Sequence, residues 1–212
     1  MIKKLSLKAS TLLFSVLIAA GIFSGCELDY GSGSMVADTN DESLQKNASA
    51  ESAVTSGDFP IVLVHGFIGW GRDEAGGPQG HYYWGGYDDL QQILTDSGHE
   101  CYTGTVGPFS SNWDRACELY AQIKGVRTDY GLAHSTKHNH NRFGKDFTGR
   151  ALLTDSDGRP DWGKPGMHQK IHLIAHSQGG HTVRILAQLL ENGYPEEMQT
   201  RYPADMPVSP LF

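Results

Sequence analysis

Cysteines, basic clusters and long apolar runs are all scarce in this chain, and each scarcity excludes a class of protein. Three cysteines among 212 residues are too few for a disulfide-dense scaffold. Residues 58–212 carry 18 acidic and 13 basic side chains without a basic cluster, which excludes nucleic acid as a partner. The apolar run Leu12–Phe23 is too short for a comfortable membrane span. The remaining length, about 155 residues, suffices for one globular domain.

The first 25 residues have the pattern of an export signal. Lysines at positions 3, 4 and 8 precede the apolar run, as in a signal peptide. Ser24 and Gly25 then stand directly before Cys26, which resembles the lipobox of bacterial lipoproteins, where the thiol is acylated. We therefore expect export, with a lipid on Cys26 anchoring the protein to the membrane surface. Because Phe23 departs from the usual aliphatic residue, ordinary secretion is the alternative.

Residues 26–57 are rich in serine, alanine, aspartate, asparagine and glycine and poor in apolar side chains. Such a segment cannot offset its chain entropy by burying apolar surface, so we predict a disordered acidic tether. It would join the anchor to a catalytic domain over residues 58–212. A cleaved propeptide has the same composition and is the alternative.

A serine stands between a predicted strand and a predicted helix. Lys170–Ile174 is short, apolar and partly β-branched, which is typical of a buried strand. Apolar residues at helical spacing predict a helix over His181–Asn192. Ser177 lies between them, with the small residues that a very tight turn requires at positions 175 and 179. A phosphate loop or a plain strand–helix corner would share this pattern, but it indicates the nucleophile elbow of an α/β-hydrolase.

A second half of the same active site is predicted upstream. Phe59–Phe67 has the pattern of a buried strand that opens into a glycine turn. In α/β-hydrolases the loop after this strand supplies one backbone N–H to the oxyanion, and the residue after the nucleophile supplies the other. Phe67 and Gln178 would hold these positions, and Ser177 would be the nucleophile. Both halves occur in the right order, so we predict an α/β-hydrolase fold with a mostly parallel sheet flanked by helices.

The intervening chain has further regular patterns. Apolar spacing predicts helices over Asp88–Ser97 and Asn112–Lys124 and a strand over Glu100–Val106. The segment Ile68–Gly86 is crowded with glycine and aromatic residues. Either a substrate-facing loop or buried aromatic packing would account for it.

Histidines gather in the segment Asp129–Phe147, which has no long apolar run. The spacings from His134 to His138 and to His140 both lie within the range of zinc sites. By itself such a segment is more often a polar surface loop, and the spacing does not choose between the two later histidines. The histidines at positions 172, 176 and 181 are expected to be structural, the first on a buried strand and the others around the elbow.

Five stretches together resemble the secreted zinc-containing lipases of Gram-positive bacilli and their staphylococcal relatives. They are Ile61–Trp70, Tyr83–Gly86, Val106–Glu118, Asp129–His134 and Ile171–Gly180. The resemblance implies hydrolysis of triacylglycerol or another carboxylic ester by a serine nucleophile. It also implies a structural zinc bound by Asp114, His134 and His140, with His138 left out.

Two smaller features accompany this resemblance. Cys101 and Cys117 are predicted on a strand and a neighbouring helix, so a disulfide is conceivable in an exported protein. The resemblance implies that Cys117 is unpaired, which favours two buried thiols. The insertion Leu152–Pro165 departs from the family pattern and predicts a hairpin or turn, with a calcium loop as the weaker alternative.

The acid and the base that such a serine needs do not follow it in the expected way. In this fold the acid and then the histidine come after the nucleophile. The 35 residues after Ser177 contain one aspartate, Asp205, and one histidine, His181, which lies on the elbow helix and precedes that acid. We expect an α/β-hydrolase domain truncated after the elbow helix and inactive by itself, with its triad partners beyond Phe212. The family resemblance implies that the fourth zinc ligand, an aspartate, also lies beyond Phe212. The alternatives are a non-catalytic surface lipoprotein on a decayed hydrolase fold, and a phospholipase or other esterase.

Overall fold

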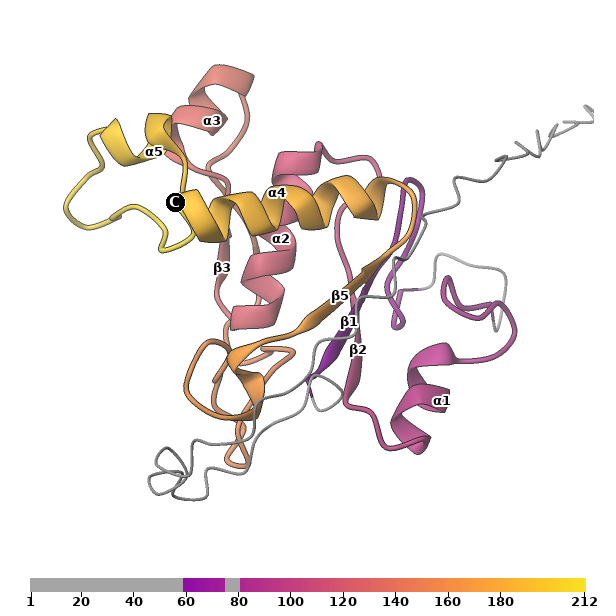
Figure 1. The fold of residues 1–212 in the computed structure, drawn as a ribbon. Helices are drawn as coiled ribbons and strands as arrows, with labels where there is room; N and C mark the ends of the chain where they lie inside the picture. The colour runs from indigo at the N-terminus through magenta and orange to yellow at the C-terminus, as the bar shows by residue number, and fades with distance from the viewer. Residues whose placement is uncertain (1–58, 75–80) are drawn as a thin grey trace, which may run out of the picture. The chain divides into compact units, whose positions relative to one another are not determined.

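A parallel sheet of three strands, in the order β2–β1–β5, runs through the middle of the structure (Figure 1). The computed structural model describes residues 59–74 and 81–212, so the predicted signal peptide, Cys26 and the tether lie outside the described residues. The strands are β1 (Ile61–Val64), β2 (Cys101–Gly104) and β5 (His172–Ala175). Strand β1 pairs in parallel with both neighbours, and Val64 is level with Ala175 of β5. The carboxyl ends of β1 and β5 therefore lie side by side.

Helices α2 (Asn112–Lys124) and α4 (Gln178–Asn192) pack against each other and against this sheet. Helix α2 has the predicted bounds, because Ser111 caps its start and Gly125 ends it in the left-handed conformation. Helix α4 begins before the predicted His181, since it starts directly after the serine. Three of the shorter helices are α1 (Leu90–Asp96), α5 (Pro195–Gln199) and the 3₁₀ helix Met167–Gln169. None of the helices in the described part of the chain has the length and hydropathy of a membrane span.

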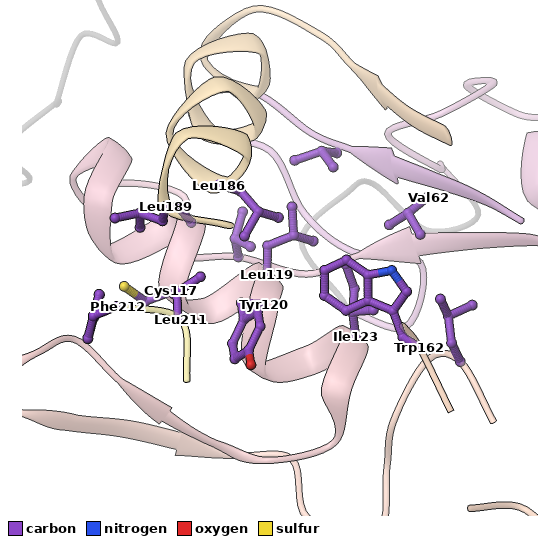
Figure 2. Packing of buried hydrophobic residues seen from close by; sticks show 14 residues of the cluster. Val62, Cys117, Leu119, Tyr120, Ile123, Trp162, Leu186, Leu189, Leu211 and Phe212 are labelled. Atoms are coloured by element: carbon purple, nitrogen blue, oxygen red, sulfur yellow. The ribbon is translucent and has the colours of Figure 1, made fainter. Parts of the chain in front are cut away.

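The hydrophobic core lies between the two long helices and the sheet (Figure 2). Leu119 and Ile123 of α2 share this cluster with Leu186 and Leu189 of α4, and Val62 of β1 joins it from the sheet. All five side chains are buried, and the four aliphatic residues on the helices recur at the spacing of one helix face. This packing fixes α4, and with it the start of α4, against the carboxyl end of β1.

Strand β5 is an edge of the sheet in the described part of the chain, and the prediction of a buried strand over Lys170–Ile174 is wrong in that respect. Burial alternates along β5, with His172 and Ile174 exposed. The strand itself was predicted at nearly the right place. Its apolar composition does not reveal whether another strand covers its second edge.

The histidine-rich segment is more regular than the predicted polar loop. Strands β3 (Arg127–Asp129) and β4 (Phe143–Asp146) pair antiparallel, and helix α3 (Leu132–His138) lies between them in the chain. Helices α3 and α5 lie side by side in Figure 1. The segment needs no long apolar run because polar contacts hold it, such as the two hydrogen bonds from Arg142 to the Asp129 carboxylate at 2.9 and 2.6 Å.

The expectations for the thiols and for the insertion are confirmed. Cys101 and Cys117 are both buried and unpaired, and burial raises the pKa of Cys101 to about 11. Within the insertion, Thr154 and Pro160 form an antiparallel bridge, as a turn requires. The Asp155 Oδ1 accepts the N–H groups of residues 157 and 159, so this oxygen holds the turn together.

Candidate active site and metal centre

Ser177 occupies a strained turn between β5 and α4. Its backbone angles are φ 55° and ψ −125°, a conformation that residues with a side chain rarely adopt. A Cβ atom added to Gly179 would lie 2.4 Å from the Val64 carbonyl oxygen, so only glycine lets α4 approach β1 this closely. The predicted elbow geometry is therefore present.

The loop after β1 packs directly on this turn. A Cβ atom added to Gly66 would lie 2.8 Å from the Ser177 Cβ. In the described part of the chain, the backbone N–H groups of Phe67 and Gln178 donate to no acceptor, whereas the next N–H, of Ile68, donates to the Pro108 carbonyl at 3.0 Å. The structure thus brings the predicted nucleophile to the loop that carries Phe67, and both predicted oxyanion donors are free of other partners.

A buried arginine fixes this loop, and the sequence analysis did not assign it a role. Arg115 on α2 is fully buried, and burial lowers the pKa of its guanidinium. It donates to the His65 carbonyl, to the Gly107 carbonyl at 2.7 Å and to the Thr182 hydroxyl at 3.0 Å. One side chain therefore joins the loops after β1 and β2 to α4. The available signal was an arginine on the helix face that also carries Leu119.

Tyr83 is a second residue that the sequence analysis left unassigned. Its hydroxyl accepts the Gly66 N–H at 2.9 Å and lies 2.6 Å from His176 Nδ1. Two aromatic residues of the predicted aromatic segment, Tyr83 and Trp84, thus pack against the elbow, where both rings contact His176.

Exposed apolar side chains border the same loop. Phe67 is 56%, Ile68 57% and Phe109 70% exposed, and the two phenylalanine rings meet edge to face with centroids 5.5 Å apart. These side chains therefore leave exposed apolar surface beside the Phe67 N–H.

Ser177 has no histidine partner in the described part of the chain, which contains all ten histidines. His65 is buried, with Nδ1 on the Gly66 carbonyl at 2.9 Å and Nε2 accepting the Val106 N–H at 3.3 Å. His181 is exposed on α4, contrary to the expectation that it packs around the elbow. The described residues thus hold a candidate nucleophile and two candidate oxyanion donors but no base on the serine hydroxyl.

Asp114, His134 and His140 converge as a potential metal-binding group, with ligand atoms all within 4.8 Å of one another. The Asp114 Oδ1 lies 3.2 Å from His134 Nε2 and 3.8 Å from His140 Nε2. Ligand atoms bound tetrahedrally to zinc at about 2.0–2.2 Å stand roughly 3.3–3.6 Å apart, so the three side chains fit such an ion. The Asp114 Oδ1 is also buried without a hydrogen-bond partner in the described part of the chain, as a ligand oxygen would be.

The structure also separates His140 from His138. Asn139 ends α3 in the left-handed conformation, with φ 54° and ψ 49°, and turns the chain back toward Asp114. The Nδ1 of His140 donates to the Asn141 carbonyl at 2.9 Å, which leaves Nε2 with the lone pair that a metal requires. His138 remains exposed and outside the converging group.

The environment of His134 keeps its ring ordered and neutral. The ring stacks on Trp113 with centroids 4.9 Å apart and planes inclined by 12°. Burial lowers the pKa of His134, and His138 and His140 lower it further, against the opposing effect of Asp114. A neutral imidazole is the form that binds a metal ion.

Comparison with known proteins gives a consistent family. Residues 57–212 match the model of the lipase-like C-terminal domain family. A lipase of Staphylococcus epidermidis is 41% identical over 186 residues, which cover 84% of this chain and 25% of that protein. Among solved structures, lipase 1 from Pelosinus fermentans matches with a TM-score of 0.64 and 50% identity, over 74% of this chain and 38% of that one. The Staphylococcus hyicus lipase matches with a TM-score of 0.63 and 38% identity, over the same two shares. This chain therefore spans about a quarter of the curated relatives it matches.

Proposed function

The chain belongs to the family of lipase-like C-terminal domains, and from that premise we propose that it carries the nucleophile and oxyanion hole of a serine ester hydrolase acting on lipids. The observation that carries the proposal is the strained backbone of Ser177 at the strand–helix turn, beside two N–H groups without acceptors. Strain of this kind persists where the surrounding structure enforces it, and it gathers at reactive residues.

In the proposed reaction the Ser177 Oγ attacks the ester carbonyl carbon, and the carbonyl oxygen becomes an oxyanion. This oxyanion accepts the N–H groups of Phe67 and Gln178, and each such donor is worth on the order of 10²–10³ in rate. The serine proton passes to a histidine and then to the leaving alcohol, and water releases the fatty acid from the acyl-enzyme. We place that histidine and its acid partner in the part of the lipase fold that this chain does not span.

The proposed substrate class is an ester with an apolar acyl chain, such as a triacylglycerol. The support is the exposed apolar surface of Phe67, Ile68 and Phe109 beside the oxyanion donors. A phospholipid ester or a shorter ester would present the same reacting group, so a substrate panel separates these activities.

The proposed zinc site consists of Asp114, His134 and His140. The ion would supply a cross-link between α2 and the segment 129–147. It would be structural if a fourth protein ligand came from the part of the lipase fold that this chain does not span, because four protein ligands leave no position open for a catalytic water.

Export and anchoring through Cys26 also belong to the proposal, although residues 1–58 lie outside the described part of the chain. Two or more acyl chains hold a protein stably on a membrane, and a diacylglyceryl cysteine provides them. Cys26→Ser should therefore release the protein into the medium, measured by fractionation of the producing cells. Membrane association that persists in this variant would indicate an uncleaved signal sequence.

A chimera tests the catalytic assignment. Residues 59–212 would replace the matching part of the Staphylococcus hyicus lipase, which supplies the rest of the fold. We expect the chimera to hydrolyse emulsified triacylglycerol, and Ser177→Ala to lower kcat by about 10⁶. The control is Ser156→Ala, an exposed turn serine, which should leave the rate unchanged.

The rival hypothesis is a non-catalytic surface lipoprotein on a decayed hydrolase fold. A folded chimera whose rate does not depend on Ser177 would support that rival and contradict the assignment of the nucleophile. The 212-residue chain alone should show little turnover in the same assay under both the hydrolase hypothesis and the non-catalytic one.

A further inference from the structure

The carboxylate of Glu197 lies at the start of the helix that carries His134. Glu197 belongs to α5, and its side chain is fully buried. Its Oε1 accepts the His134 N–H at 2.7 Å, and its Oε2 accepts the Ala133 N–H at 3.0 Å. A buried carboxylate is thus bonded to the main chain of a candidate metal ligand.

Helix α3 has no capping side chain of its own. Its N-cap is Gly131, and its first turn contains no acidic residue. The Leu132 N–H donates to the Tyr202 hydroxyl at 3.1 Å, and that hydroxyl in turn donates to Glu197. The first N–H groups of a helix have no partner within the helix. In α3 the first three are taken by two side chains that follow in the chain after α4.

The backbone of α3 is shaped to receive this carboxylate. Gly131 has a φ of 89°, and a Cβ atom added there would lie 2.1 Å from the Glu197 Oε1. Helices as short as α3 are marginal by themselves, so their position depends on such tertiary contacts. Glu197 therefore decides where the first turn of α3 stands.

We propose that Glu197 is a positioning residue of the candidate metal centre. It holds the backbone of His134 so that the imidazole stacks on Trp113 and directs Nε2 toward Asp114, 3.2 Å away. Glu197 itself touches neither the ion nor the substrate and acts only through His134. A ligand must be held within about 0.5 Å of its productive position, so a loosened first turn of α3 weakens binding. This inference rests on the metal site proposed above.

Glu197→Gln in the full chain tests the proposal. The amide keeps the shape of the side chain but turns an NH₂ group toward main-chain N–H donors. Zinc and cobalt affinity would be measured by competition with a chromophoric chelator, alongside the melting temperature of the metal-free protein. We expect metal affinity to fall by about 10- to 100-fold, the usual cost of losing a partner that orients a metal ligand. The matched control is Glu196→Gln, an exposed neighbour on α5, which should keep the affinity of the unchanged chain.

Amide hydrogen exchange gives a readout that needs no metal. The amides of residues 133 and 134 should exchange faster in Glu197→Gln than in the control. If Glu197→Gln does not fold, the Tyr202→Phe variant provides the test. This variant keeps the Glu197 carboxylate and removes the hydroxyl that links the carboxylate to the Leu132 N–H. We expect that variant to lose at least threefold in affinity.

Two results would overturn the proposal. If Glu197→Gln folds and keeps its metal affinity but melts at a lower temperature, Glu197 is a purely structural residue. If Glu197→Gln does not fold, unchanged metal affinity in Tyr202→Phe leads to the same conclusion. If the unchanged chain binds neither zinc nor cobalt, the metal site itself fails. In that case the amide exchange still reports whether Glu197 holds His134, which separates the two failures.

Discussion

Two adjacent glycines lie in the first turn of helix α4, and their surroundings differ completely. A Cβ atom at Gly179 would overlap the carbonyl oxygens of Val64 and His65, at 2.4 and 2.9 Å. A Cβ atom at Gly180 would meet nothing within 4 Å. The first glycine is therefore a steric requirement of the elbow, and the second is not.

This contrast predicts opposite effects of the same substitution. Gly179→Ala should lower the free energy of unfolding by about 1–3 kcal/mol, because the backbone of β1 or α4 must shift. Gly180→Ala should leave it unchanged or raise it by up to about 1 kcal/mol, since alanine is the better helix former. Urea unfolding of the two variants measures both. Equal destabilisation would contradict the steric argument.

His168 lies between two carboxylates and joins the insertion to the residue before β2. His168 Nδ1 donates to the Asp161 carboxylate at 2.6 Å, and Nε2 donates to the Glu100 carboxylate at 2.9 Å. Burial alone would lower the pKa of His168, but the hydrogen bonds to Asp161 and Glu100 outweigh it and raise the pKa above its usual 6.5. The bridge therefore stabilises the fold fully below pH 6.5, and its contribution is lost as pH rises through the higher folded-state pKa.

His168→Asn should accordingly cost most stability in mild acid. We expect the difference in unfolding free energy between the unchanged chain and this variant to be larger at pH 5.5 than at pH 8.5. The matched control is His99→Asn, an exposed histidine. A difference that grows with pH would show that the bridge is not formed by an imidazolium.

At the scale of elements, α2 connects the two candidate sites. Arg115 holds the loops beside the serine, while Asp114, the residue before it, faces the histidines of the segment 129–147. Neighbouring residues on a helix point about 100° apart, so one helix can serve two separate sites. A metal ion at Asp114 would thus join α2 to α3 through side chains alone.

Zinc should stabilise the chain, and this stabilisation should depend on His140 but not on His138. At a zinc concentration of 100 times Kd, binding adds about 2.7 kcal/mol to the unfolding free energy. We expect His140→Ala to lose most of this gain and His138→Ala to keep it. The measurement is the melting temperature with zinc and with a chelator, and a loss in His138→Ala alone would reassign the ligand.

Sequence patterns predicted the elements whose signals are local. Asn112–Lys124 has apolar periodicity, a serine cap and a terminal glycine, and the helix has the predicted bounds. The segment 129–147 lacks such signals because polar tertiary contacts, such as those of Glu197, hold it. Histidine spacing did not choose between His138 and His140, because it does not encode the left-handed turn at Asn139; only the family resemblance selected His140.

At the scale of the whole molecule, the exposed edge of the sheet stands out. In the described part of the chain, β5 pairs only with β1, and Ile174 on β5 is 45% exposed. An open edge strand with apolar side chains invites pairing with another chain. Arg115 and Tyr83 each join segments that are distant in the sequence, so no local sequence pattern predicts their roles.

The open edge should make the chain associate as its concentration rises. Ile174→Lys should reduce this association, because a lysine on an edge strand opposes pairing. Sedimentation velocity over a range of concentrations measures it. Val126→Lys is the matched control, at a residue 41% exposed outside the sheet, and an equal effect there would point to general charge rather than the edge.

The pairing of β1 with β5 also determines when the elbow can form during synthesis. Residues 61–64 and 172–175 are adjacent in the sheet. At about 5–20 residues per second, the ribosome needs roughly 5–20 seconds to make the intervening stretch. During that interval the apolar strand β1 can pair only with β2, and one of its edges stays open. The nascent chain therefore passes through a stage in which the Phe67 loop has left the ribosome before Ser177 exists, and a chaperone that shields β1 in that interval would favour folding over aggregation.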